Sequence, residues 1–156
     1  MAVKIIEGKP EGAKHKIAIV VSRFNDLIGQ RLLQGALLTL ASHGVSEEHI
    51  EVAWVPGAWE IPVAAAKFAK SERFAGVVIL GAVIQGETSH HEYIANEVAA
   101  SLGRLTSETG IPVAFGLLTT ATLDQALARA GETSDNKGAE AVLHLLETLT
   151  VLHQIR

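Results

Sequence analysis

The chain has 156 residues, of which 48% are hydrophobic and only 4% aromatic, and its formal net charge is -4. This length suits one domain with a substantial core, which must consist mainly of Val, Ile, Leu and Ala. The negative charge and the lack of a basic cluster argue against nucleic-acid binding. The absence of cysteine excludes disulfides and thiolate zinc sites. No stretch has the length of a membrane span or the character of a signal peptide, so we expect a cytoplasmic protein.

Apolar runs of strand length alternate with helical patterns along the whole chain. In chain order, the pattern predicts a strand at 17–21, a helix at 27–43, a strand at 50–55, a helix with Pro62 in its first turn, a strand at 75–84, a helix at 91–109, a strand at 113–118, a short helix at 123–130 and a helix at 136–153. Asn25 or Asp26 is expected to cap the first helix.

Alternating strands and helices form βαβ units with right-handed crossovers. We therefore expect a three-layer αβα sandwich around a four-stranded parallel sheet, flavodoxin-like, in a single domain spanning residues 1–156. Residues 3–6 form a short apolar burst that could add an N-terminal edge strand to this sheet or to a neighbour's. The apolar residues of the last helix spread around most of its circumference, so this helix needs cover on more than one side. That requirement predicts a homo-oligomer.

The best candidate site follows the apolar run that ends at Ile84. This run leads through Gln85-Gly86-Glu87-Thr88-Ser89 to His90 and His91. In an open parallel sheet, ligands bind beyond the carboxyl ends of the strands, where helix N-termini attract anions. His90 could be a general acid/base or a surface histidine at a helix start. Thr88 could hold a phosphate or simply cap the helix. Because adjacent helical residues do not share a face, we expect no metal site at His90 and His91.

Two common nucleotide-binding motifs are excluded. The stretch from Gly81 to Thr88 resembles a phosphate loop, but Glu87 stands at the lysine position and would repel phosphates. The glycine fingerprint of dinucleotide-binding folds is absent.

Other strand ends carry aromatic and charged residues on the same rim. Phe24 could offer a stacking surface to a planar ligand or pack as a lid, and Trp59-Glu60 follows Pro56-Gly57 in a second strand-end loop. Arg129 lies near a helix C-terminus, where the helix dipole favours a cation. Lys137 opposes the dipole in the first turn of its helix and hints at a nearby anion. Together these residues suggest a planar ligand and a phosphorylated one.

Five stretches in this order resemble the lumazine synthase family, and the resemblance covers essentially the whole chain. They are Ser22-Arg23-Phe24-Asn25, Val55-Pro56-Gly57-Ala58-Trp59-Glu60-Ile61-Pro62, the loop from Gly81 to Tyr93, Ile111-Pro112-Val113-Ala114-Phe115-Gly116 and Asn136-Lys137-Gly138. The resemblance implies a transferase that condenses 5-amino-6-(D-ribitylamino)uracil with 3,4-dihydroxy-2-butanone 4-phosphate. The product would be 6,7-dimethyl-8-ribityllumazine, the precursor of riboflavin, made without a metal or redox cofactor.

The same resemblance implies the roles of individual residues. His90 would transfer protons. The substrate-binding residues would be Phe24, Ala58, Trp59, Glu60, Ala82, Val83, Ile84, Glu87, Thr88, Phe115, Arg129 and Lys137. The site would lie between adjacent subunits of a homopentamer. The short 131–138 loop is similar to that of members whose pentamers close into an icosahedral shell, and riboflavin synthase would be a partner.

Two positions depart from the family pattern. Gln85 stands where the family often has Arg, and His91 where Phe or Tyr is usual.

Two other functional classes compete with the enzyme. A non-catalytic lumazine- or flavin-binding or shell protein is disfavoured by the retained His90, Arg129 and Lys137. A generic flavodoxin-like phosphate-binding module would leave the Trp59-Glu60 and Phe115 motifs unexplained.

Overall fold

A parallel sheet of four strands forms the centre of the computed structural model, which describes residues 2–86, 90–132 and 135–156. The strands are β1 (Ile17–Ser22), β2 (Ile50–Val55), β3 (Gly76–Ile84) and β4 (Val113–Thr120). Their order is β2-β1-β3-β4 and all three pairings are parallel. The same strand order begins the flavodoxin-like sheet, so the expected fold class is confirmed.

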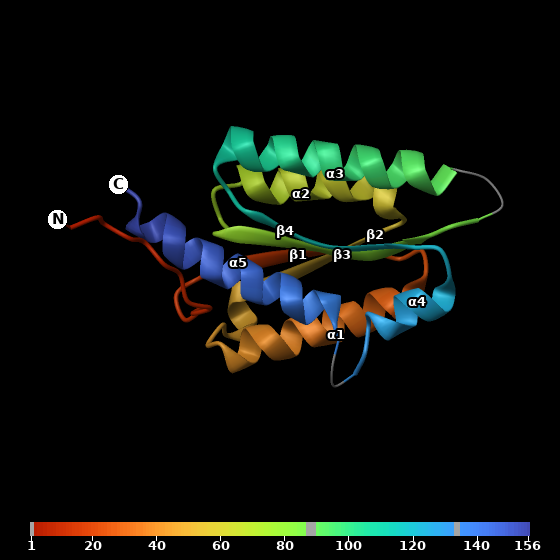
Figure 1. Cartoon of the computed structure of the whole chain (residues 1–156), viewed down its shortest axis with the longest axis horizontal. Coiled ribbons are helices and arrows are strands. Elements are labelled where there is room, and N and C mark those ends of the chain that lie inside the picture. Colours follow the sequence, from red (N-terminus) through yellow and green to blue (C-terminus); the bar gives the residue numbers. More distant parts are fainter. Residues whose placement is uncertain (1, 87–89, 133–134) are drawn as a thin grey trace.

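Helices cover both faces of the sheet (Figure 1). On one face lie α2 (Ile61–Lys70) and α3 (His90–Thr109), and on the other lie α1 (Asp26–Ser42), α4 (Leu123–Ala128) and α5 (Lys137–Gln154). Short 3-10 turns, η1 (Glu47–His49) and η2 (Ala58–Glu60), precede β2 and α2. The predicted elements are confirmed, with shifts of one or two residues at their ends.

Side chains that alternate along the strands divide the core into two halves. Ile17, Ile19 and Val21 of β1 pack toward α1 and α5, whereas Ala18 and Val20 pack toward α2 and α3. Every residue of β1 is buried, and so is every residue of β3 except its last. This double burial explains why both strands are nearly continuous apolar runs in the sequence.

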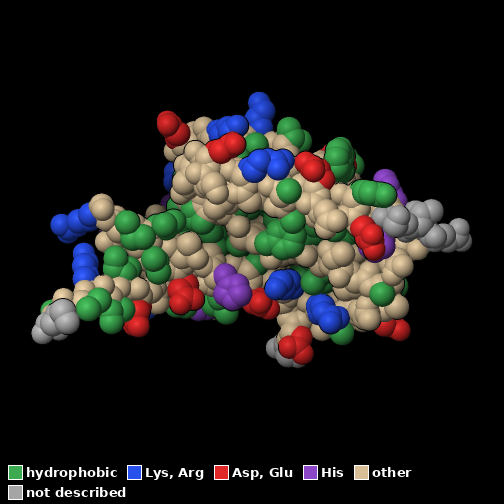
Figure 2. All heavy atoms as spheres, turned by 45° about the horizontal axis from the view of Figure 1, so that its top comes forward, with side chains coloured by type: hydrophobic (Ala, Val, Ile, Leu, Met, Phe, Trp, Pro, Cys, Tyr) green, Lys and Arg blue, Asp and Glu red, His purple; other side chains and the backbone are tan. Residues whose placement is uncertain are grey.

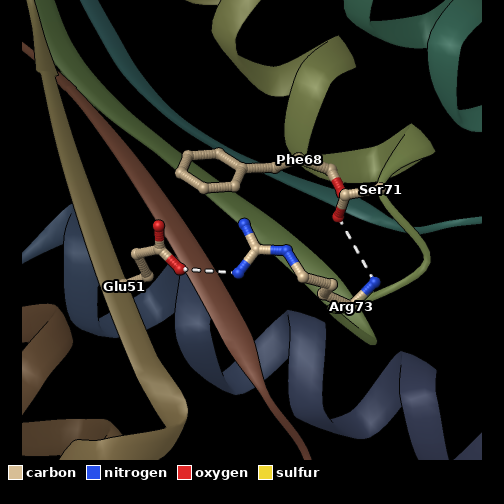
Figure 3. A network of polar contacts seen from close by, with 4 residues as sticks. All are labelled: Glu51, Phe68, Ser71 and Arg73. Atoms are coloured by element: carbon tan, nitrogen blue, oxygen red, sulfur yellow. Dashed lines mark hydrogen bonds and ion pairs between the residues drawn. The ribbon is translucent and has the colours of Figure 1, made fainter.

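An exposed polar cluster joins the amino ends of β2 and β3 (Figure 3). Arg73 Nη1 lies 3.2 Å from Glu51 Oε2, and the Arg73 backbone N–H donates to Ser71 Oγ at 3.3 Å. Ser71 Oγ in turn donates to the Phe68 carbonyl at 2.7 Å. The Arg73 and Glu51 side chains are 58% and 51% exposed, so their ion pair contributes little to stability. The cluster lies at the opposite end of the sheet from the predicted ligand site.

Residues before β1 lie outside the sheet and run beside the end of α5. The Lys9 N–H donates to Thr150 Oγ1 at 2.7 Å, and Gln154 Nε2 donates to the Glu7 carbonyl at 2.8 Å. Residues 3–6, which are part of the described chain, form no strand here. Their addition to a neighbour's sheet stays a prediction. Among the described residues, no helix is both long enough and apolar enough to cross a membrane.

His15, just before β1, gives the folded state a dependence on pH. Burial of its ring, and secondarily the nearby His153, lower the pKa of His15 below the ordinary value of 6.5. The unfolded chain therefore binds this proton more tightly than the folded chain does. Stability is retained above the ordinary pKa and decreases as the pH falls through it toward the lowered value.

We predict that His15→Gln reduces this loss of stability. The urea midpoint should fall less in the variant than in the wild type when the pH is lowered from about 7.5 to about 5.5. Groups that do not interact with His15 contribute equally to both proteins, so the difference between the two shifts reports His15 together with its coupling to His153. Identical shifts would contradict the prediction.

Candidate active site

The carboxyl ends of β1, β2 and β3 open onto a hollow of about 520 Å³ beside the start of α3. Its lining combines the turn after β1, the η2 turn after β2, the end of β3 and the first turns of α3. The predicted site residues that line it are Phe24, Ala58, Trp59, Glu60, Ala82, Val83, Ile84 and His90. The structure therefore brings together residues that are up to 66 positions apart in the sequence, counted from Phe24 to His90.

Large aromatic side chains stand exposed at the mouth of this hollow. Phe24 is 72% exposed and Trp59 is 59% exposed, although side chains of this size usually gain stability by burial. A flat ligand stacked on such a ring would remove its apolar surface from water. The hollow is therefore suited to a planar, partly apolar molecule.

Backbone and side-chain hydrogen bonds fix the turn that carries Phe24. The Arg23 N–H donates to the Val55 carbonyl at 2.7 Å, and the Phe24 N–H donates to the Pro56 carbonyl at 3.0 Å. Asn25 adopts a left-handed conformation, with φ 63°, which asparagine tolerates better than most residues. The turn after β1 is thereby fastened to the end of β2.

Asn25 corrects one sequence prediction. It occupies the N-cap position of α1, but its side chain does not cap the helix. Instead, Asn25 Nδ2 donates to the Ala82 carbonyl at 3.3 Å, across to β3. The side chain thus joins two strand ends rather than satisfying the helix N-terminus.

His90 is the first residue of α3, and both His90 and His91 line the hollow. A helix N-terminus carries partial positive charge, so His90 stands where an anionic group would also be attracted. Glu87 and Thr88, whose role in phosphate binding is implied by the family resemblance, lie outside the described residues.

The cationic candidates lie in a different place. Arg129 and Lys137 line a second hollow of about 580 Å³, together with Thr119 and Thr120 at the end of β4. Arg129 Nη1 donates to the Gln125 carbonyl at 2.9 Å, and Lys137 Nζ lies 3.2 Å from Glu140 Oε1. This hollow combines two cations and strand-end hydroxyl groups with the carboxylates of Asp135 and Glu140, so an anion there would pair with Arg129 and would compete with Glu140 for Lys137.

Phe115 lies apart from both hollows. It is a 41% exposed residue of β4, beside a shallow depression shared with Thr106 of α3 and His144 of α5. Figure 2 shows hydrophobic side chains gathered in the band between the two helical layers, with charged side chains mostly above and below it. Within one chain, the structure therefore brings neither Phe115 nor the cationic pair into the hollow that holds Phe24 and His90.

Several residues of the first hollow were not predicted as site residues. They are Pro56, Gly57, Gly86, His91 and Ile94. Ile94 had a usable signal, because it follows His90 by one helical turn and so shares its face. Pro56 and Gly57 were recognised only as a turn.

One comparison with known proteins bears on this geometry. The model of the 6,7-dimethyl-8-ribityllumazine synthase family matches residues 14–153. The matched range includes both hollows and Phe115.

We predict that Phe24→Ala weakens binding of 6,7-dimethyl-8-ribityllumazine, because the exposed ring offers a stacking surface. Loss of one stacked aromatic should cost about 1–3 kcal/mol of binding free energy. Calorimetric titration would measure the change. The matched control is Leu27→Ala, since Leu27 is an exposed residue of the next turn that lines a different hollow. Equal affinities of the two variants would rule out stacking on Phe24.

Proposed function

The chain belongs to the 6,7-dimethyl-8-ribityllumazine synthase family, and we propose that it condenses 5-amino-6-(D-ribitylamino)uracil with 3,4-dihydroxy-2-butanone 4-phosphate. Family membership implies lumazine synthase activity in riboflavin biosynthesis, and the choice of these two substrates and the transferase class are part of our proposal. The observation that carries it is the hollow at the strand ends. Exposed aromatic rings and His90 line this hollow in a chain that the family model matches over 14–153.

The first hollow would bind the pyrimidine. Phe24 would stack on the ring, and the end of β3, from Ala82 to Ile84, would line its pocket largely through backbone groups. The ribityl chain needs hydrogen-bond partners for its hydroxyl groups, and the η2 turn with Ala58, Trp59 and Glu60 would supply them. In support, all of these residues face one hollow whose walls are mainly apolar and whose polar groups are few.

The second hollow would bind the phosphate. Arg129 and Lys137 would pair with it, Lys137 in place of its present contact with Glu140, and the Glu87-Thr88 backbone would complete the grip. Because the two hollows are separate within one chain, we infer that the full site forms between adjacent subunits. One subunit would provide Phe24, Trp59 and His90, and its neighbour would provide Phe115, Arg129 and Lys137.

The reaction then needs positioning and proton transfer. The pyrimidine amine attacks the ketone, and water leaves to give an imine. Elimination releases inorganic phosphate, and ring closure releases a second water. Holding the two substrates together should supply much of the rate. His90 would move protons between the carbinolamine, imine and enol. These steps call for no metal or redox cofactor.

The assembly is a further part of the proposal. We propose a cytoplasmic, single-domain subunit that forms a homopentamer, with closure into an icosahedral shell and contact with riboflavin synthase as extensions. Apolar side chains left exposed at both termini support association. Leu152 and Ile155 of the C-terminal segment are 40% and 56% exposed, and Val3 and Ile5 are 75% and 74% exposed. A neighbouring subunit would cover such residues.

We predict that the wild-type protein forms lumazine faster than the uncatalysed mixture of both substrates, and that His90→Ala lowers kcat. The loss should approach the ~10²-fold of a typical acid–base residue. Absorbance of the product measures both rates. His43→Gln, at the far end of α1, is the control for a histidine remote from the hollow. A wild-type rate equal to background, with lumazine still bound, would favour a non-catalytic binding protein.

We also predict complementation between two inactive variants. His90→Ala damages the first half of the site and Arg129→Ala the second. In rings refolded from an equal mixture, about a quarter of the interfaces would join two intact halves, so activity should reappear. Native mass spectrometry would verify that mixed rings form. If mixed rings form and stay inactive, the site does not combine residues from two subunits.

A further inference from the structure

Asn136 joins three separate segments beside the second hollow. Its Nδ2 donates to the Arg31 carbonyl of α1 at 3.0 Å and to the Gly131 carbonyl at 2.9 Å. Its Oδ1 accepts the Ala139 N–H at 3.0 Å and so caps α5. One half-buried side chain therefore holds α1, the connection after α4 and the start of α5 together.

Two glycines make room for this arrangement. A Cβ atom on residue 35, inside α1, would collide with the amide of Asn136. A Cβ atom on residue 138, in the first turn of α5, would collide with the Leu32 carbonyl. Glycine inside a helix is unfavourable by about 1 kcal/mol relative to alanine. Gly35 therefore lowers the stability of α1 itself, but its missing side chain leaves the space in which the Asn136 amide contacts α1.

The backbone around Asn136 also sets the positions of Arg129 and Lys137. Ala130 and Asn136 form an antiparallel bridge, and the Lys137 N–H donates to the Arg129 carbonyl at 2.9 Å. The two cations are therefore anchored on paired backbone segments, each adjacent to a residue of that bridge. Asn136 itself is not among the described residues that line the second hollow.

Holding two cations side by side needs such an anchor. The long side chains of Arg129 and Lys137 contact Gln125 and Glu140 here, and they would lose conformational freedom on converging on one ligand. A displacement of about 1 Å at a positioning group can lower the rate by as much as ~10²-fold. A fixed backbone pair would therefore favour binding of an anion by both cations.

We propose that Asn136 is a positioning residue for the phosphate of the substrate, acting through the Arg129–Lys137 backbone pair. It does not touch the ligand. This inference rests on the proposed function, because it assigns the second hollow to the phosphorylated substrate.

The test compares Asn136→Asp with the wild type. Aspartate keeps the volume and the capping oxygen but replaces the donor group with an oxygen facing two carbonyls. We expect the Kd for orthophosphate and the KM for the butanone phosphate to rise roughly tenfold, with the KM for the pyrimidine unchanged. Calorimetry and steady-state kinetics measure the three quantities. Asn96→Asp, at an exposed position of α3, controls for the change in net charge, and Gly35→Ala, which adds no charge, separates displacement of the backbone pair from direct repulsion between the new carboxylate and phosphate.

A second variant keeps the test decisive if Asn136→Asp fails to fold. In Gly35→Ala, the added methyl group on α1 would displace the Asn136 side-chain amide. This variant should show the same selective loss of affinity for orthophosphate and the butanone phosphate. Gly103→Ala is its control, because a Cβ atom there meets nothing within 4 Å. Unchanged orthophosphate affinity in the folded variant, or an equal loss for both substrates, would overturn the inference. The orthophosphate titration needs no turnover, so it stays informative even if the wild-type protein proves inactive.

Discussion

The parallel pairing of β1 with both of its neighbours is the constraint on which the candidate site depends. β1 is buried on every side, so its backbone groups must find their partners within the sheet. The register aligns Ser22 with Val55 on one side and Val21 with Leu80 on the other. Since the strands run in one direction, the chain leaves β1, β2 and β3 at the same edge. The aromatic turns and the start of α3 converge there as a consequence of strand direction.

The order of the elements followed from the sequence because each apolar run has the length and periodicity of its element. The end of β4 did not, since the pattern predicted a stop at residue 118. Thr119 and Thr120 instead pair with Val83 and Ile84 of β3. A partner strand recruits these residues, and their β-branched shape fits the pleated sheet. Such an extension depends on contacts that a local pattern does not contain.

The sequence also predicted which residues lie at the rim of the sheet, but not how their side chains are grouped there. A strand-end position places Phe24 or Trp59 on the rim of the sheet, but it does not say which face of the sheet the side chain meets. The same limit applies to Arg129, whose separate hollow appears only when α4 is placed against β4. Asn25 shows a related limit. Its residue type and its place before α1 predicted a helix cap, but its side chain donates instead to the carbonyl of Ala82, 57 positions away in the sequence. The roles assigned to single residues came from the family resemblance rather than from spacing.

The separation of the two hollows has a consequence for how copies of the chain can join. A contact that pairs the first hollow of one copy with the second hollow of the next uses two different surfaces, so it is heterologous. Such a contact repeats without end unless its rotation closes the ring. A closed ring completes as many sites as it has subunits, an open row leaves one unmatched half at each end, and a lone subunit completes none. Under the proposed arrangement, the contact between the two hollows would both close the ring and complete the active sites. A substitution that weakens this contact would therefore reduce assembly and activity together.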